Sequence, residues 1–305
     1  MAASAELLAQ HAALTQSVGI ADLTGRTLLE IRGADRANFL HAFCTNNVKA
    51  LQTGQSCEAF VTSPQGKTLG HVLVLCEADR LLLDTSPGQA KPLIDHFDRY
   101  VISEDVQFVD RTAETGVLLV AGARAAELLP IAGQQRAARV PYVSNGWFFW
   151  VAAADVQAMI GKLEQAGALL CGPEAVEAAR IEAGFPLFAR DFTEDNLPQE
   201  VGRDAEAISF TKGCYLGQET VARIDALGHV NKKLVGIKFA GDGVPEIGTP
   251  LLAGDKQVGS VTSSTWSPRL SAPLALAYIR TPHARAGSQL ASPLGPAEVV
   301  ALPLA

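Results

Sequence analysis

The sequence predicts an α+β protein with a small all-β domain at its C-terminal end. Strand-like segments occur in adjacent pairs between single helices, which is typical of α+β layering rather than of the regular βαβ order of a parallel sheet. No G-x-G-x-x-G follows a strand and no Walker loop is present, so dinucleotide- and nucleotide-binding folds have little support. The composition changes near residue 230. We therefore expect an α+β region over 1–229 and a β domain over 230–305.

The first elements expected are a strand and a helix. The aliphatic stretch TLLEI (27–31) predicts a strand. Asp35 then precedes Phe39, Leu40 and Phe43, which recur at helical spacing. Because Asp favours the N-cap position, we expect a helix that begins just after Asp35.

The next segments predict a β-hairpin. EAFVTS (58–63) and HVLVLC (71–76) flank the turn residues Pro64-Gln65-Gly66. Further elements follow in alternation. They are a strand over 79–86, a helix over 93–100, strands over 105–110 and 116–121, a helix over 124–132, a strand over 147–153 and an amphipathic helix over 155–166.

The C-terminal part, from residue 233 onward, contains only short strand-like pieces. They read LVGIKFA, TPLLA, KQVGSVTSS, ALAYIR and AEVVALP, and Gly, Pro and Asp turns separate them. No helical periodicity is visible there. Many short strands between turns are typical of a small antiparallel barrel or sandwich.

Composition narrows the functional classes. The chain has 305 residues, 48% of them hydrophobic, which is enough for a sizeable core in roughly two or three domains. Its net charge of −7 argues against a protein that coats nucleic acid or binds an anionic membrane. The first residues do not resemble a secretory signal, and the apolar run 72–76 is far too short to cross a bilayer. A cytoplasmic protein is expected.

The cysteines do not form a recognisable framework. The sequence has 5 of them, scattered and never spaced as C-x-x-C, which is a poor pattern for disulfides, zinc or an iron–sulfur cluster. Cys44, Cys57 and Cys76 lie in apolar stretches and are expected to pack as small core residues. No metal site is expected.

The stretch FTKGCYLGQETVARI (210–224) places Cys214 in a different setting. Lys212 lies two residues upstream, and a helix is expected to begin near Gly217. A nearby cation or a helix N-terminus favours the reactive thiolate form of a cysteine. Gly213 and Gly217 allow unusual backbone geometry and leave room for a partner. These residues make Cys214 a candidate functional thiol.

A structural explanation of the same stretch stays open. In it, Cys214 packs in a tight turn that Tyr215 anchors, and Glu219 and Arg223, four residues apart, simply support the helix. The spacing also does not exclude a pairing of Cys214 with one of the 6 histidines of the chain, although nothing specific supports it.

The octapeptide KGCYLGQE (212–219) resembles the signature of the YgfZ family, K-G-C-Y-x-G-Q-E, at every fixed position. The elements IEAGFPLF (181–188) and LPQE (197–200) are also similar to family sequences. So are the N-terminal passage LEIRGADRANFLHAFCTNNVKAL and the following SPQGKTLG. The resemblance runs in the same order from about residue 20 to 280.

YgfZ proteins resemble the aminomethyltransferase, or T-protein, of the glycine cleavage system. The resemblance implies a GcvT-like cloverleaf, with two intertwined α+β modules in 1–229 and an antiparallel β-barrel in 230–305. It implies a role in the assembly or repair of iron–sulfur proteins, especially [4Fe–4S] proteins, including tRNA-modifying enzymes. It implies tetrahydrofolate as a ligand, and iron–sulfur assembly proteins or client enzymes as partners, with no direct nucleic-acid or membrane contact.

The resemblance also implies roles for individual residues. Cys214 would be the functional thiol and Lys212 its electrostatic partner. The residues expected to shape or present the loop are Gly213, Tyr215, Gly217, Gln218, Glu219 and Arg223.

The sequence departs from the T-protein at its acidic position. T-proteins carry adjacent acidic residues just after the glycine of the second hairpin strand, and one of them is catalytic. Here Gly70 and His71 stand at that place, without a carboxylate. Glycine cannot act as a general acid or base. The alternatives to the iron–sulfur role are therefore a true aminomethyltransferase, which this departure disfavours, and a non-catalytic scaffold on the same fold.

The folate contacts also differ from the T-protein pattern. Val176 stands where that family has an arginine, and the turn PYVSNGWFF (141–149) lacks the glutamate that binds the pterin. A pterin needs paired donors and acceptors, which valine does not supply. The polar residues left as candidate folate contacts are Tyr142, Asn145, Arg180 and Glu182.

Overall fold

The computed structural model describes residues 3–133 and 136–304. The chain forms two compact units, each built from segments that are distant in sequence. Unit 1 contains Met1–Thr24, Gly116–Pro186 and Asn231–Ala305, and unit 2 contains Gly25–Thr115 and Leu187–Val230. A unit boundary thus falls at residue 230, and the segment after it is grouped with residues 116–186.

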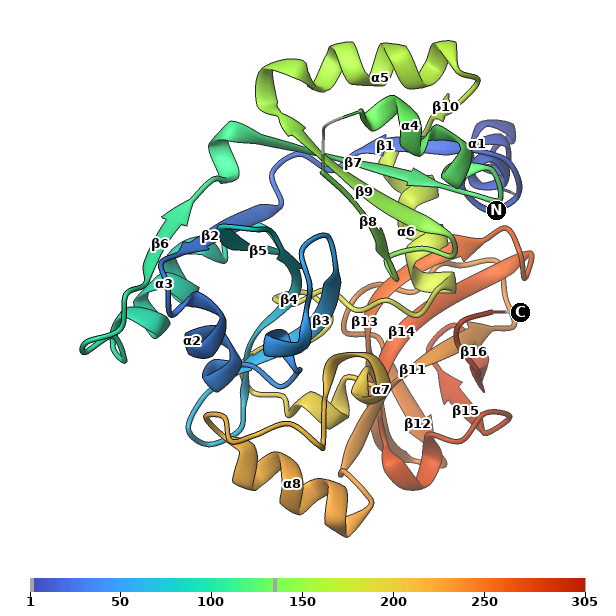
Figure 1. The fold of residues 1–305 in the computed structure, drawn as a ribbon. Helices are drawn as coiled ribbons and strands as arrows, with labels where there is room; N and C mark the ends of the chain where they lie inside the picture. The colour runs from blue at the N-terminus through green and yellow to red at the C-terminus, as the bar shows by residue number, and fades with distance from the viewer. Residues whose placement is uncertain (1–2, 134–135, 305) are drawn as a thin grey trace. The chain divides into compact units, whose positions relative to one another are not determined.

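Unit 2 is built on a five-stranded sheet with two helices on one face (Figure 1). The strand order is β3-β4-β5-β2-β6, and each neighbouring pair is antiparallel. The strands are β2 (Thr27–Arg32), β3 (Ser56–Thr62), β4 (Thr68–Cys76), β5 (Arg80–Thr85) and β6 (Gln107–Asp110). The helices are α2 (Arg36–Phe43) and α3 (Ala90–Asp98).

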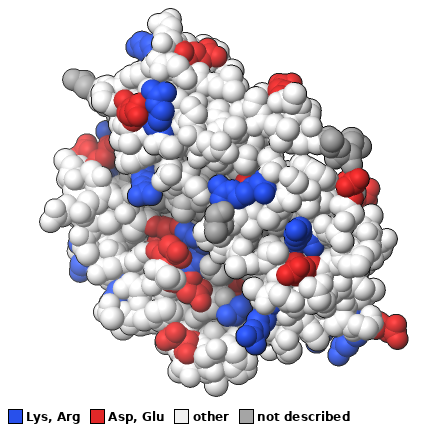
Figure 2. Space-filling view, turned by 90° about the vertical axis from the view of Figure 1, so that its right-hand side faces the viewer, with Lys and Arg blue, Asp and Glu red and all other residues white. Residues whose placement is uncertain are grey.

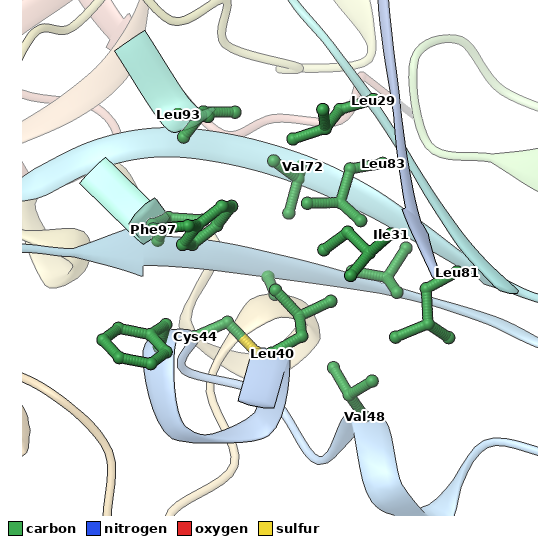
Figure 3. Close-up of a cluster of buried hydrophobic side chains, with 14 of the residues drawn as sticks. Leu29, Ile31, Leu40, Cys44, Val48, Val72, Leu81, Leu83, Leu93 and Phe97 are labelled. Atoms are coloured by element: carbon green, nitrogen blue, oxygen red, sulfur yellow. The ribbon is translucent and has the colours of Figure 1, made fainter. Parts of the chain in front are cut away.

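The alternation of side chains along a strand decides which face of this sheet is apolar. Leu29 and Ile31 of β2 point to the same face and pair in register with Leu83 and Leu81 of β5. Apolar side chains from α2 and α3 pack on that face, and Figure 3 shows the resulting cluster. Glu30, between the two β2 residues, points the other way and lies among arginines. The alternation along β2 thus places its leucine and isoleucine in the core of unit 2 and its glutamate on the opposite face.

Unit 2 has further helical elements. They are α7 (Asp204–Ala207), α8 (Gln218–Leu227) and the 3₁₀ helices η1 (Val48–Ala50), η2 (Thr112–Glu114) and η5 (Pro198–Glu200). Three of them, α7, α8 and η5, belong to the segment 187–230. Helix α8 begins directly after Gly217, as the sequence predicts.

Unit 1 contains a second five-stranded sheet, with the order β10-β1-β7-β9-β8. Its strands are β1 (Gly19–Asp22), β7 (Thr115–Ala121), β8 (Arg136–Val140), β9 (Gly146–Ala152) and β10 (Leu169–Leu170). Its helical elements are α1 (Ala5–Gln16), η3 (Ala125–Leu128), α4 (Leu129–Ala132), η4 (Ala153–Asp155), α5 (Val156–Gln165) and α6 (Pro173–Glu182). Apolar residues of α5, such as Met159 and Leu163, pack against β1, β7 and β9.

The C-terminal part of unit 1 is a closed antiparallel barrel with the strand order β11-β14-β13-β12-β15-β16. The strands are β11 (Lys232–Phe239), β12 (Pro250–Ala253), β13 (Lys256–Ser267), β14 (Ala272–Arg280), β15 (Gln289–Ser292) and β16 (Gly295–Val300). Up to residue 304 the barrel segment holds a single helical turn, η6 (Thr281–His283). The prediction of a C-terminal β-barrel is confirmed.

The predicted elements compare with the structure as follows. The strand over 27–31, the hairpin and the helix over 155–166 are confirmed in place. The segment 124–132 forms a 3₁₀ turn followed by one short helical turn instead of a regular helix. Asp35 stands at the start of α2, but its carboxylate does not cap the helix. It accepts a hydrogen bond from the Asp105 main-chain N–H at 2.9 Å instead, while the expected N-cap position of Asp35 and the start of the helix just after it are confirmed.

Among the described residues, no helix combines the length and the apolar character needed to cross a membrane. Figure 2 shows one face of the molecule, on which basic and acidic side chains lie in small mixed groups over a mostly uncharged surface.

The core of unit 2 contains a histidine that predicts a pH dependence of stability. His96 is 5% exposed and packs against Phe43, Phe97 and Tyr100. Burial, and then the charge of Arg99, lower the pKa of His96 below its ordinary value of 6.5. Below that value the unfolded chain takes up a proton that the folded chain does not, so stability falls as the pH falls.

We therefore expect His96→Phe to reduce the loss of melting temperature between pH 7.5 and pH 5.5. The measurement is thermal unfolding of both proteins at the two pH values. An equal loss in the two proteins would show that His96 is not a source of the acid sensitivity.

Candidate functional site

The candidate site is the loop of residues 212–217, which lies in unit 2 between α7 and α8. Its sequence is KGCYLG. Two parts of unit 2 hold the loop in place: the C-terminal end of α2 and the turn of the β3–β4 hairpin.

Lys212 attaches the start of the loop to α2. Its side chain points inward, and the residue is 8% exposed. The Nζ atom donates hydrogen bonds to the carbonyl oxygens of His41 (2.6 Å), Cys44 (2.6 Å) and Asn46 (2.9 Å). The last carbonyls of a helix have no partner within the helix, and a cation near them is favourable. The Lys212 ammonium also lies 4.9 Å from the centre of the Tyr215 ring.

The end of the loop is attached at two further points. The Leu216 N–H donates to the Ala42 carbonyl of α2 at 2.9 Å, and the Thr62 hydroxyl of β3 donates to the Leu216 carbonyl at 2.6 Å. Gly217 has a φ of +82°, and a Cβ there would lie 2.3 Å from the Ser63 carbonyl oxygen. The close approach of the loop to the hairpin turn therefore requires glycine at position 217.

The turn into α8 uses the motif residues Tyr215 and Gln218. The Tyr215 N–H donates to the Gln218 side-chain oxygen at 3.3 Å, and the Gln218 N–H donates to the Tyr215 carbonyl at 3.1 Å. Tyr215 is buried, and burial, followed by the neighbouring Cys44, raises the pKa of its hydroxyl to about 12. Glu219 and Arg223 are exposed on α8. Tyr215 thus anchors the loop, as the structural explanation of the stretch expected.

Cys214 differs from the other thiols in its exposure. It is exposed, whereas Cys44 and Cys171 are buried and Cys57 and Cys76 are half-buried. Burial raises the pKa of the Cys44 thiol, raises that of Cys57 to about 12 and raises that of Cys171 to about 11. Exposure and thiolate formation together govern the reaction rate of a thiol. The structure thus leaves Cys214 as the accessible thiol of the five.

The structure does not place Lys212 as the expected electrostatic partner of Cys214. An ammonium group has three protons, and three main-chain carbonyl oxygens accept them. The side chain points toward α2, and Cys214 lies at the surface. The sequence shows that Lys212 and Cys214 are close along the chain, but it does not show the direction of the lysine side chain.

Arg180 and Glu182, expected as folate contacts, lie on α6 in unit 1 and have partners within that unit. Arg180 is 0% exposed and donates to the Glu177 carboxylate (2.5 Å), the Phe185 carbonyl (2.5 Å) and the Ser263 hydroxyl (2.9 Å). The guanidinium therefore joins α6 to barrel strand β13.

Glu182 is similarly engaged at the end of α6. Its carboxylate lies 2.6 Å from the His11 ring nitrogen and accepts hydrogen bonds from the Ser267 hydroxyl (2.5 Å) and the Arg269 N–H (3.2 Å). Burial alone would raise the pKa of Glu182, but these hydrogen bonds hold it below its ordinary value. The carboxylate is therefore kept ionised by contacts inside unit 1.

The other two candidate folate contacts lie around the β8–β9 turn. Tyr142 is buried, with its ring 5.5 Å from that of Phe148 and 5.4 Å from that of Phe185. Asn145 is exposed, has a φ of 52° and accepts a hydrogen bond from Arg139 at 3.4 Å. Because Phe185 follows α6, the structure brings Tyr142 close to the end of that helix.

Sequence analysis missed a buried charged cluster in unit 2. His71 of β4 lies 2.7 Å from the Glu58 carboxylate of β3, and Arg203 donates to the same carboxylate at 2.8 and 2.6 Å. Burial would raise the pKa of Glu58, but the hydrogen bonds and charges of Arg203 and His71 lower it to about 2. His71 also stacks on Phe60 with ring centres 4.9 Å apart. Glu58, an acidic residue at the start of the apolar segment EAFVT, is the feature of the sequence that could have indicated this cluster.

The described residues contain no group of three or more His, Cys, Asp or Glu side chains arranged to hold a metal ion.

Two protein families match this chain, one in its N-terminal part and one in its C-terminal part. Residues 2–135 match the GCVT N-terminal domain family, and residues 232–304 match the glycine cleavage T-protein C-terminal barrel domain family. The aminomethyltransferase of Rubrobacter xylanophilus is 28% identical over 90% of this chain and 79% of its own length. The aminomethyltransferase of Symbiobacterium thermophilum is 26% identical over 93% of this chain and 84% of its own length.

A solved structure shows the same fold. The glycine cleavage system aminomethyltransferase T of Bartonella henselae superposes with a TM-score of 0.89, at 20% identity, over 98% of this chain and 89% of its own. The expected GcvT-like fold is confirmed, including its C-terminal barrel.

The exposure of Cys214 predicts its rank in chemical labelling. Under limiting iodoacetamide at neutral pH, Cys214 should be alkylated first, and Cys57 and Cys171 should react at least about tenfold more slowly because burial raises their pKa values. Peptide mapping of the labelled protein measures the order. Faster labelling of any half-buried or buried cysteine in the folded protein would contradict this ranking.

The two loop glycines predict a matched pair of variants. Gly217→Ala should destabilise the protein by at least about 2 kcal/mol, because alanine resists a left-handed conformation and its Cβ would meet the hairpin backbone. Gly213→Ala should leave stability nearly unchanged, because a Cβ there would meet only the His41 ring, at 4.0 Å. Denaturant unfolding measures both, and equal losses would refute the assigned difference.

Proposed function

We propose that this chain, which has the GcvT-like fold and matches both of its domains, is a thiol-dependent factor for the assembly or repair of iron–sulfur proteins. Its clients would be [4Fe–4S] proteins, which include tRNA-modifying enzymes, and it would work in the cytoplasm. One observation carries the proposal: the chain exposes a single cysteine, Cys214, on a loop that is fixed at both ends. The loop sequence contains the motif that resembles the YgfZ signature.

The exposed thiol defines what the chain itself can contribute. A cysteine thiolate is a nucleophile and a metal ligand. One thiol cannot hold an iron–sulfur cluster without further ligands, which a partner would have to supply. We therefore assign Cys214 to contact with a client or assembly protein rather than to a resident cluster.

The surroundings of the missing acid disfavour aminomethyl transfer, the activity named for the relatives. At the corresponding place, Gly70 packs against Leu93, where a Cβ would lie 3.0 Å from the leucine side chain. His71 lies next to Gly70 and is bound to Glu58. The Glu58 carboxylate has a pKa of about 2 and is held by Arg203, so it is a poor general acid or base near neutral pH.

Tetrahydrofolate is the small-molecule ligand that the fold favours. Two of the four residues expected to contact it, Arg180 and Glu182, already have partners inside unit 1, and Val176 of α6 is apolar and buried. Contacts to a folate would thus come from Tyr142, from Asn145 or from other groups of the chain. The proposed chemistry of Cys214 has no step on folate.

Two other functions are kept as alternatives. The names of the relatives support an aminomethyltransferase, and a non-catalytic scaffold would use the same fold with an inert thiol. A glycine cleavage assay with purified components tests whether the chain is an aminomethyltransferase. We expect the chain to form no methylene-tetrahydrofolate when it replaces the T-protein, because the acid is absent at 69–71. Sustained turnover would replace our proposal with aminomethyl transfer.

A cysteine exchange in cells tests the proposed role. Cys214→Ala should lower the activity of [4Fe–4S] enzymes several-fold under oxidative stress, while the protein stays folded and abundant. Cys171→Ala is the matched control, because that thiol is buried in unit 1 and should have no role in client contact. Enzyme activities are normalised to client protein levels. Wild-type activities in the Cys214→Ala cells would favour the scaffold.

A further inference from the structure

We propose that Lys212 is a positioning residue: it fixes the place of Cys214 by closing the C-terminal end of α2, and it does not activate the thiol through its charge. This inference rests on the proposed function in one respect, since it takes Cys214 to be the functional thiol. It concerns a residue that the sequence motif alone assigns to electrostatic activation.

The first support is the geometry of the ammonium group. Three carbonyl oxygens, from His41, Cys44 and Asn46, converge on Nζ within 2.6–2.9 Å. These carbonyls belong to the last turn of α2 and to the residues just after it. A helix end that is buried without partners is costly, and the lysine supplies partners from outside the helix. The contact therefore stabilises α2 and the loop together.

The second support is that loop and helix end are linked again by the main chain. The Leu216 N–H donates to the Ala42 carbonyl of the same helix end. Lys212 and Leu216 thus hold two sides of the loop against α2, with Cys214 between them. A residue between two fixed points has little backbone freedom, so the direction of its Cα–Cβ bond is defined.

The third support concerns the charge. The carbonyl oxygens around Nζ carry partial negative charge, which offsets the field of the ammonium on that side. The three protons of the buried Lys212 ammonium point to these carbonyls, and Cys214 lies at the surface, where water weakens charge interactions. The Lys212 charge acts on buried and half-buried groups around it: it favours the thiolates of Cys44 and Cys57, and, after burial and before Lys49, it lowers the pKa of His41 to about 4.

The open side of the loop lies at Gly213. A Cβ on Gly213 would meet nothing closer than the His41 ring nitrogen at 4.0 Å, and its φ is not in the left-handed region. The fold therefore does not require glycine at this position. A client that reaches Cys214 can approach along Gly213 and the neutral His41 ring.

The test uses a nitroxide spin label on Cys214, which the exposure of this thiol makes selective. In the wild-type protein we expect a partly immobilised spectrum, because the backbone that carries the label is held on both sides. Lys212→Met should convert it to a mobile spectrum and should raise the His41 pKa measured by NMR, because a nearby cation is removed. The pH profile of Cys214 alkylation should keep its midpoint.

Two further variants complete the design. Lys49→Met is the charge control, because Lys49 is exposed and also lowers the His41 pKa, but it holds no part of the loop. It should leave the spin-label spectrum unchanged. Thr62→Val removes the hydroxyl that binds the Leu216 carbonyl without a change of charge, and it should mobilise the label even if Lys212→Met does not fold.

The opposite pattern would overturn the inference. If Lys212→Met moves the alkylation midpoint upward by one pH unit or more and leaves the label immobilised, Lys212 acts on the thiol through its charge. An immobilised label in Thr62→Val would also count against a loop held by these contacts. All readouts use purified protein, so they stand apart from the cellular test of Cys214 in iron–sulfur maintenance.

Discussion

The buried ammonium group of Lys212 is the interaction on which the Cys214 loop depends. Lysine is seldom buried, because its charge must find partners that replace water. Here three main-chain carbonyl oxygens at the end of α2 provide them. The same contact satisfies a helix end that would otherwise need water, so one interaction meets two requirements. It also turns the chain so that Cys214 faces outward while Tyr215 faces inward.

The β3–β4 hairpin adds a steric constraint to this electrostatic one. The Gly217 and Gly66 backbones approach so closely that a Cβ on either would meet the other segment at less than 3.0 Å. The exposed thiol is thus held by a helix end on one side and a hairpin turn on the other. A rigid, exposed thiol is suited to a partner that must find it in one orientation, and less suited to a dithiol exchange that needs a second cysteine.

Local patterns predicted much of the fold, and distant contacts decided the rest. The hairpin, the barrel and the start of α8 follow from alternation, turn residues and glycine, which are properties of neighbouring residues. The direction of Lys212 was not predictable, because its partners lie more than 160 residues away. The contact of Glu58 with Arg203 was not predictable either, because the two residues are 145 residues apart in the sequence. Arg180 and Glu182 are candidate ligand contacts in the sequence because they are polar, and a helix pattern does not reveal their partners Ser263 and Ser267 on the barrel strand β13.

Native-state hydrogen exchange of the Leu216 amide is the most direct measurement of the rigidity of the loop. That N–H is bonded to the Ala42 carbonyl, at the point where the loop meets α2. We expect it to exchange as slowly as the amides of the central strand β5, with protection lost only when unit 2 unfolds. Exchange at the rate of an unstructured peptide, while β5 stays protected, would show a loop that opens freely and would contradict the account.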